Sequence, residues 1–390
     1  MKYFDYAATC PMNEEALQTY IKASQEYFGN TRSVHDAGSK ADGLAEHCRK
    51  RLAELLNVRA EGITFTSGGT ESNLLALYAL AHAERGKHIV ISAGEHSSIH
   101  NITAKLVEEE GYEVSKVGLT KEGAIDVQEL EQVVRKDTVF VSIQHVNSDI
   151  GTIQPLESIS EICKENRVFL HSDCVQSFGK IDLSQVASLV DSFSISSHKI
   201  YGPKGVGALY IRPSISFTPF LPDVSHESGV RQGTLNTPGI AAFTTSAEIS
   251  VTNMENNQQQ ITTLKKEFLN ALDDMGDSVK VVGSGLESSV PVVGLCIQET
   301  DGQHVMLEGN RRGYFFSTGS ACQVGNNGAP KTLLSMGVTE EEAKTFIRIS
   351  FGVDQSVDDA IGLANCLKEV IASGRKLYEN DAVCGDNDLA

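Results

Sequence analysis

The stretch GITFTSGGTESNLLALYALAHA (residues 62–83) joins a short β-branched run to an apolar helical pattern through a glycine turn. Residues 62–66 have the composition of a buried strand, and residues 71–83 that of a buried helix. A strand that passes directly into a helix is the building unit of α/β proteins. This stretch therefore predicts an α/β fold.

The same unit recurs along the chain. Further strands are predicted at 87–92, 138–145, 167–172, 192–196 and 206–211, and helices after residue 97 and at 156–166. Near-continuous apolar strands alternating with helices predict a mostly parallel sheet covered on both faces. Ligands bind such sheets at the carboxyl ends of the strands.

The pattern changes from about residue 241. A long polar helical stretch leads into short strands at 292–297 and 347–350, which predicts a smaller α+β domain. The acidic segment 379–390 has no periodicity, and we expect it to be frayed.

The composition narrows the class of protein. Of the 390 residues, 41% are apolar and 22% charged, as in globular proteins, and the formal net charge is −18. An acidic surface argues against nucleic-acid binding and against an anionic membrane surface. No stretch is apolar enough to span a bilayer. We predict a cytoplasmic protein, since the start MKYFDYAATCPM does not resemble a secretory signal.

The cysteines point to reduced thiols and not to a metal centre. None of the eight forms a CxxC pair, and His145 and His171 have no ligand-like spacing with a carboxylate or thiol. We therefore expect no metal site and mostly inert core cysteines.

Residues that could bind a ligand or react follow three of the predicted strands. The turn in TSGGTESN (66–73) aims backbone N–H groups and a helix N-terminus at one point, as a phosphate requires. Asp173 follows a strand and is either a helix cap or a carboxylate for a protonated ring nitrogen. Lys199 is either a solvated lysine or a desolvated amine that attacks carbonyls.

Together the three groups match pyridoxal 5′-phosphate (PLP). That cofactor needs its phosphate held, its pyridine nitrogen paired with a carboxylate, and its aldehyde joined to a lysine. His96, after another strand, offers a ring to stack on the cofactor. The glycine-rich loop after Lys199 would fix the direction of the amine.

Eight motifs in one order extend the match over about residues 3–375: TSGGTESN, GEH, QHVNSDIG, HSDCVQSFGK, SSHKIYGPKGVGALYIR, RQGTLN, FFSTGSAC and IRISFG. The chain closely resembles the cysteine desulfurases of the NifS/IscS type, in the class V aminotransferase group of fold-type I PLP enzymes. The resemblance implies a large PLP-binding α/β domain over residues 16–254. Residues 1–15 and 255–390 would form a small α+β domain carrying a catalytic cysteine loop at about 315–330.

The resemblance also implies roles for individual residues. Lys199 would form a Schiff base with the cofactor, Asp173 would pair with the pyridine nitrogen, and Gln176 would bond the ring hydroxyl. His96 would stack on the ring and move protons, and Arg348 would bind the substrate carboxylate. The phosphate would be held by Gly69, Thr70, Ser196 and His198, and by Thr234 across the interface of a homodimer with shared sites.

One position departs from the family pattern. Family members often have asparagine where this chain has Ser148, at a residue that contacts the ring region. Because serine is shorter, Asn147 or a water would have to make that contact, so the contacting residue stays open.

Cys322 lies among small residues before a Gly-Asn-Asn-Gly run, the composition of a flexible loop. From composition alone it is an incidental loop cysteine or a nucleophile. The resemblance implies the second: Cys322 would take the sulfur of L-cysteine as a persulfide, release L-alanine, and pass the sulfur to an acceptor protein. The acceptor would serve iron–sulfur clusters, a thio-cofactor or tRNA.

Three other functions stay open. A class V aminotransferase would share Lys199 and Asp173 without needing Cys322, and a selenocysteine lyase would differ in substrate. A non-enzymatic scaffold is disfavoured because Lys199, Asp173 and Arg348 are all present.

Overall fold

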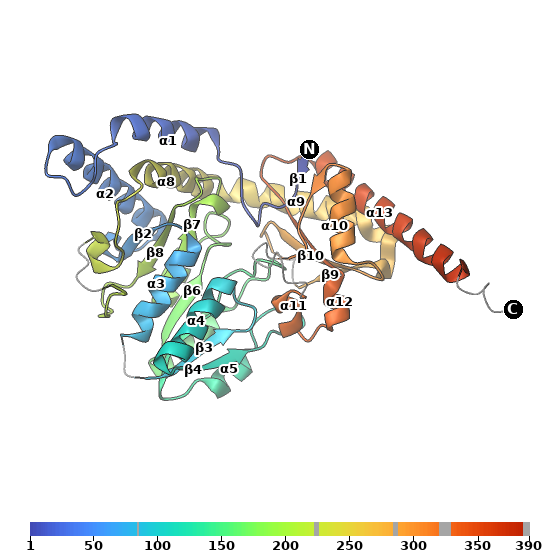
Figure 1. Cartoon of the computed structure of the whole chain (residues 1–390), viewed down its shortest axis with the longest axis horizontal. Helices are drawn as coiled ribbons and strands as arrows, with labels where there is room; N and C mark the ends of the chain where they lie inside the picture. The colour runs from blue at the N-terminus through green and yellow to red at the C-terminus, as the bar shows by residue number, and fades with distance from the viewer. Residues whose placement is uncertain (84–85, 222–225, 284–287, 320–328, 385–390) are drawn as a thin grey trace.

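The computed structural model describes residues 1–83, 86–221, 226–283, 288–319 and 329–384, the last eleven as backbone only. A seven-stranded sheet forms the larger part (Figure 1). Its order is β2-β8-β7-β6-β5-β3-β4. The strands are β2 (Ile63–Thr66), β3 (His88–Ser92), β4 (Glu113–Val117), β5 (Thr138–Ser142), β6 (Phe169–Asp173), β7 (Ser192–Ser196) and β8 (Gly207–Ile211).

Only β8 runs against its neighbours in this sheet, since it pairs antiparallel with both β2 and β7. The mostly parallel α/β sheet predicted from the sequence is confirmed. The sequence did not predict β4, whose residues are largely exposed or half-buried at the sheet edge. It also placed the carboxyl end of β5 three residues too late.

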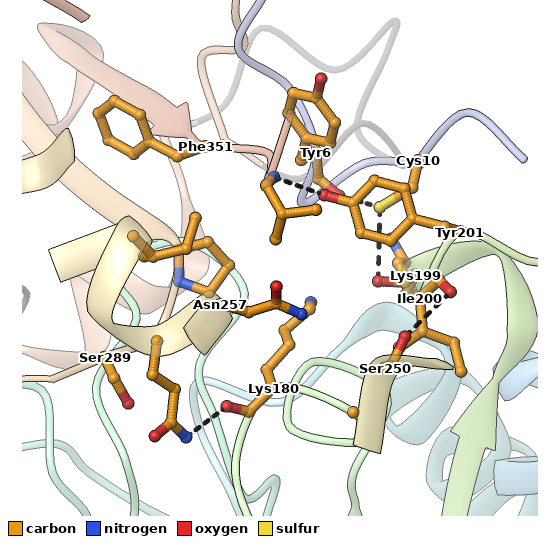
Figure 2. Close-up of a pocket in the computed structure, with 15 residues that line it drawn as sticks. Tyr6, Cys10, Lys180, Lys199, Ile200, Tyr201, Ser250, Asn257, Ser289 and Phe351 are labelled. Atoms are coloured by element: carbon orange, nitrogen blue, oxygen red, sulfur yellow. Dashed lines mark hydrogen bonds between the residues drawn. The ribbon is translucent and has the colours of Figure 1, made fainter. Parts of the chain in front are cut away.

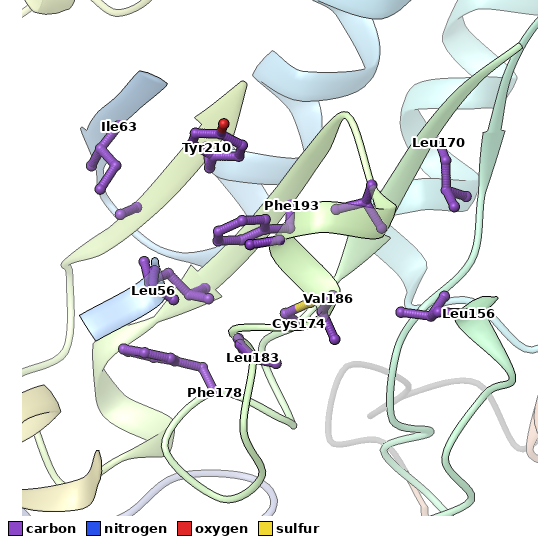
Figure 3. Close-up of a cluster of buried hydrophobic side chains, with 14 of the residues drawn as sticks. Leu56, Ile63, Leu156, Leu170, Cys174, Phe178, Leu183, Val186, Phe193 and Tyr210 are labelled. Atoms are coloured by element: carbon purple, nitrogen blue, oxygen red, sulfur yellow. The ribbon is translucent and has the colours of Figure 1, made fainter. Parts of the chain in front are cut away.

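Helices cover both faces of this sheet (Figure 1). On one face α3 (Gly69–Ala81) and α4 (Ser97–Glu110) pack their apolar side chains against the strands. The other face carries α2 (Asp36–Leu56), α6 (Leu156–Asn166) and α8 (Thr237–Thr252). Figure 3 shows part of the core on this face, where Phe193 and Tyr210 of the sheet meet Leu56 and Phe178. Burial on both faces explains why the strands read as continuous apolar runs.

The other α-helices described in this part are α1 (Glu14–Glu26), α5 (Val127–Val133) and α7 (Val186–Leu189), with short 3-10 turns η1 (Ala60–Gly62), η2 (Ser197–Lys199) and η3 (His226–Gly229). Lys199 lies in η2, directly after β7. The fold therefore places it at the carboxyl edge of the sheet.

A second core surrounds a three-stranded antiparallel sheet of order β12-β10-β9. Its strands are β9 (Val279–Val282), β10 (Val292–Ile297) and β12 (Phe346–Ser350). Its helices are α9 (Met254–Leu272), η4 (Asp273–Ser278), α10 (Gly302–Arg311), α11 (Lys331–Ser335), α12 (Glu340–Lys344) and α13 (Val357–Cys384). α13 extends to Cys384, so the expectation of a frayed segment from residue 379 is wrong for its first six residues.

The N-terminus joins this second core. β1 (Lys2–Tyr3) pairs parallel with β11 (Tyr314–Phe315), and Asp5 bridges to Ser350. We propose on this ground that residues 1–15 belong with 255–390, separate from 16–254. Among the residues described, no helix is both long and apolar enough to cross a lipid bilayer.

Candidate active site

Loops at the carboxyl ends of β2, β3, β5, β6 and β7 surround a cavity of about 210 Å³. Nine residues singled out from the sequence line it: Gly69, Thr70, His96, Asp173, Gln176, Ser196, His198, Lys199 and Arg348. Eight of them meet because parallel strands end at the same edge of the sheet, and Arg348 comes from the second sheet.

α3 supplies one end of the cavity. Its N-cap, Gly68, has φ 147°, a backbone conformation that is unfavourable for residues other than glycine. The first two residues of the helix, Gly69 and Thr70, line the cavity with the helix N-terminus behind them. Such a helix end attracts an anion through its free N–H groups and its dipole.

Asp173 lies deeper, at the end of β6, and is 7% exposed. Its Oδ2 accepts from Asn73 Nδ2 at 2.7 Å, and its Oδ1 accepts from Val175 N at 3.0 Å. The second bond resembles the cap considered from the sequence, but Asp173 begins no helix, and its carboxylate also lines the cavity.

Lys199 extends from η2 to the N-terminal segment. Its Nζ donates to Ala7 O at 2.6 Å and to Ala8 O at 2.8 Å. Burial, together with the charges of Lys180 and Arg348, lowers the pKa of Lys199 to about 8. A larger fraction of the amine is thus neutral near physiological pH than in a solvated lysine, as a nucleophilic lysine needs.

Lys180 lies close enough to Lys199 and Arg348 for their charges to interact. It was not predicted from the sequence as a site residue. It follows Gln176 by four residues, and its Nζ donates to Gln176 Oε1 at 2.9 Å. Gln176 in turn donates from Nε2 to Ala7 O at 2.9 Å. Burial lowers the pKa of Lys180 to about 8.

Lys180 and Lys199 also line a second, smaller cavity of about 40 Å³ behind the first. Figure 2 shows Lys180 extending into it, with Cys10, Lys199 and Tyr201 grouped on one side. Asn257 and Ser289, from the second core, line it as well. The amines of Lys180 and Lys199, which repel each other when both are charged, therefore lie at the boundary between the two cores.

The remaining predicted residues lie as follows. Ser196 Oγ is buried and has no hydrogen-bond partner in the described part of the chain. His198 Nδ1 lies 3.1 Å from Thr9 Oγ1, and burial lowers its pKa to about 4, so the ring is neutral. His96 caps α4, accepting at Nδ1 from Ser98 N at 3.2 Å.

Arg348 is 2% exposed and lies in β12 of the second sheet. Its Nη2 donates to Asp5 Oδ1 at 2.8 Å, and its Nη1 donates to Ser148 O at 3.3 Å. The guanidinium group of Arg348 thus reaches the cavity from the second core.

Ser148 lines the cavity, whereas Asn147 does not. Asn147 Oδ1 accepts from the backbone N–H groups of Asp149 and Ile150, at 2.9 and 3.1 Å. The asparagine is therefore used to hold the turn, and the residue facing the cavity is the serine.

Two predicted residues are not part of this cavity as described. Thr234 is exposed and does not line it. Cys322 lies outside the residues that the structure describes.

Comparison with known proteins shows the family and the fold of the chain. The family Aminotransferase class-V matches residues 2–361. The chain belongs to this family. A class-V relative from Bacillus subtilis, named putative cysteine desulfurase NifS, is 44% identical over 356 residues, which are 90% of each chain.

Two solved structures of similar proteins share the fold. A NifS-like protein has a TM-score of 0.87 at 30% identity, over 95% of this class-V chain and 100% of its own. SspA in complex with cysteine has a TM-score of 0.78 at 30% identity, over 90% of this chain and 99% of its own. The fold class predicted from the sequence is thus that of its family.

Proposed function

We propose that the chain is a PLP-dependent cysteine desulfurase, which converts L-cysteine to L-alanine and forms a persulfide on Cys322. The observation that carries this proposal is the joint placement of a helix N-terminus, Asp173 and Lys199 around one cavity. The names of the NifS relative and of the cysteine-bound neighbour support the substrate.

The residues of the cavity fit PLP. Ser196 Oγ, buried without a partner in the described residues, faces the same cavity as Gly69 and Thr70, and a phosphate oxygen would satisfy it. Asp173 would meet the pyridine nitrogen and Gln176 the ring hydroxyl, with His96 against the ring. When bound, PLP supplies an electron-accepting ring that stabilises negative charge at the substrate α-carbon.

The chain's own groups supply the rest of the chemistry. The neutral amine of Lys199 would take the α-proton, because its lowered pKa of about 8 makes it a usable base. Arg348 would bind the substrate carboxylate, and its buried Nε has no partner among the described residues. The Cys322 thiolate would attack the substrate sulfur, so that the C–S bond breaks as an S–S bond forms.

We propose a homodimer in which Thr234 reaches the phosphate of the partner's site. Thr234 is exposed, and its neighbours Gly233 and Leu235 line a groove of about 450 Å³ together with Thr31 and Arg32. Close in sequence to this groove, Phe28 is 76% exposed and Val34 fully so. Exposed apolar side chains of this size favour a protein partner.

We further propose that the enzyme works in the cytoplasm and hands its sulfur to an acceptor protein for iron–sulfur clusters, a thio-cofactor or tRNA. The formal net charge of −18 is unfavourable for binding to nucleic acid and to anionic membranes. A class V aminotransferase or a selenocysteine lyase is the alternative.

Two variants test the proposal. We expect Cys322→Ala to lose sulfide release from cysteine under reductant and to keep the near-visible absorbance of bound cofactor. Lys199→Ala should no longer retain cofactor after hydride reduction. Cys366→Ala, a buried thiol in α13, is the control and should keep both properties. Unchanged sulfide release from Cys322→Ala would reject the thiol mechanism, and transamination by that variant would favour the aminotransferase.

A further inference from the structure

A chain of hydrogen bonds joins Asp173 to His96 along one wall of the cavity. Asn73, 1% exposed and one turn into α3, donates from Nδ2 to Asp173 Oδ2 at 2.7 Å and to Ser98 Oγ at 2.9 Å. Ser98 Oγ lies 2.8 Å from His96 Nδ1. The neutral amide of Asn73 thus connects the two residues that we expect at opposite parts of the cofactor ring.

The orientation of the Asn73 amide is fixed by its neighbours. Asn73 Oδ1 lies 3.2 Å from His171 Nε2, and His171 Nδ1 lies 2.7 Å from Ser192 Oγ. Burial lowers the pKa of His171 to about 3, so the ring is neutral and carries one proton. That proton must be on Nε2, because the amide oxygen only accepts. A flipped amide would turn its oxygen toward the carboxylate of Asp173, which also only accepts.

The fixed orientation of the Asn73 amide also determines the direction of the hydrogen bond between Ser98 and His96. Since Ser98 Oγ accepts from Asn73, its own hydrogen is free to donate to His96 Nδ1. The backbone N–H of Ser98 also points at Nδ1, at 3.2 Å. Nδ1 is therefore an acceptor, and a neutral His96 ring carries its proton on Nε2.

A second carboxyl group, that of Glu95, lies near Asp173. Glu95 is buried, and its burial, followed by the nearby Asp173, raises its pKa well above the ordinary value. Its Oε1 accepts from Gln144 N. Asn73 and Val175 both donate to the carboxyl group of Asp173.

We propose that Asn73 is a positioning residue, whose two N–H bonds hold the Asp173 carboxylate toward the cofactor and set the proton of His96 on Nε2. The proposal deepens the proposed function and rests on it, because it assumes that Asp173 and His96 face PLP. Asn73 itself need not take part in proton transfer.

Asn73→Asp tests this directly, because aspartate has the shape of asparagine without its N–H groups. Two adjacent carboxyl groups do not both ionise, so Asp173 would share a proton with the new side chain. The Ser98 hydroxyl would turn to the new carboxylate and leave His96 Nδ1. Asn101→Asp is the matched control, since it makes the same charge change on an exposed residue of α4.

Two measurements read the two ends of the chain. Nitrogen NMR of protein carrying isotope-labelled histidine, with His96 assigned by His96→Gln, reports which ring nitrogen is protonated. The dissociation rate of PLP from the holoenzyme reports how strongly Asp173 holds the cofactor. In Asn73→Asp the hydroxyl donor to His96 Nδ1 is lost while the backbone N–H of Ser98 remains, so we expect the fraction of His96 protonated at Nδ1 to rise above the wild-type fraction. We expect PLP release to be about ten-fold faster, the scale of one charged hydrogen bond. Asn101→Asp should leave both unchanged.

Ser98→Ala separates the two halves of the chain and serves if Asn73→Asp does not fold. It should change the protonation of His96 and leave PLP release within about two-fold, because the bond from Asn73 to Asp173 remains. A His96 spectrum unchanged in either variant would overturn the proposal, as would PLP release unchanged in Asn73→Asp.

The result is distinguishable from a failure of the proposed function. If the wild-type chain binds no PLP, the proposed function fails, while the histidine spectrum still tests the hydrogen-bond chain. If the wild type binds PLP and desulfurates cysteine while Asn73→Asp behaves as wild type, only the role of Asn73 fails.

Discussion

At the scale of single residues, the properties of Lys199 are set by groups far from it in sequence. Its pKa is lowered to about 8, mainly by burial and next by the charge of Lys180. Lys180 is held in place by its bond to Gln176. The nucleophile of the site is thus adjusted by a cation that need not touch the substrate.

The role of Lys180 gives a pH prediction. In Lys180→Met a positive neighbour is lost, so the ammonium form of Lys199 becomes less costly and its pKa rises. We expect the midpoint for PLP capture by the apo-protein to move from about 8 to higher pH. A shift of about half a unit corresponds to roughly 0.7 kcal/mol of coupling. Capture rates across pH, followed in the near visible, measure it.

Lys204→Met is the control for this experiment, since Lys204 is exposed in the loop after Lys199. Its midpoint should match the wild type. A midpoint in Lys180→Met that stays at the wild-type value or falls would show that Lys180 does not act on the amine.

Most residues of the candidate site could be predicted from the sequence because each follows a recognisable strand. Asn73 and Lys180 were missed, although a signal existed: they lie three and four residues after Thr70 and Gln176. In helical or turn-rich segments such spacings return side chains to one side. The Asp5–Arg348 pair had no such signal, because 343 residues separate its members.

At the scale of elements, the close approach of β8 to the turn before α3 shapes the phosphate end. A Cβ on Gly207 would lie 2.7 Å from the Cα of Gly68 and 2.8 Å from Ile195 O. Both are backbone atoms, which cannot turn aside as a side chain can. The middle position of β8 between β2 and β7 therefore requires glycine at its first residue.

Gly207→Ala follows as a prediction. The added methyl group should push Gly68 away from β8 and disturb the N-terminus of α3. We expect a loss of about 1–3 kcal/mol in the free energy of unfolding, as for other overpacked sites, and weaker PLP binding. Denaturant unfolding and PLP titration measure the two effects.

Gly43→Ala in α2 is the matched control, because nothing lies within 4 Å of its Cβ position. Alanine should stabilise that helix by roughly 0.5–1 kcal/mol. If both variants unfold alike, contact with Gly68 is not the reason for glycine at position 207.

At the scale of the whole molecule, the site combines two cores and, in our proposal, two chains. Arg348 reaches the cavity from the second sheet, and Ala7 and Ala8 line it from the N-terminal segment that joins that core. Thr234 lies apart, in a loop that Glu227 ties to Arg49 through two short bonds of 2.9 and 2.7 Å. A loop fixed in this way can present Thr234 to a partner at low entropic cost.

Mixed dimers test the shared site. We expect Lys199→Ala and Thr234→Val homodimers each to be impaired. A mixed dimer of the two has one site with both changes and one with neither, so it should recover up to about half of wild-type activity per dimer if Thr234 acts across the interface. Recovery no greater than the average of the two homodimers would place Thr234 in its own subunit's site or outside both.

The sequence by itself determined the alternation of strands and helices, and therefore the edge at which Asp173 and Lys199 meet. These features follow from apolar periodicity and from glycine turns, which can be recognised in short segments of the sequence. Only the tertiary structure decided the antiparallel place of β8, the use of Asn147 in a turn, and the bonds among Asn73, Ser98 and Asp173. Those depend on the packing of segments distant in the chain, since burial and hydrogen-bond direction exist only once the segments are together.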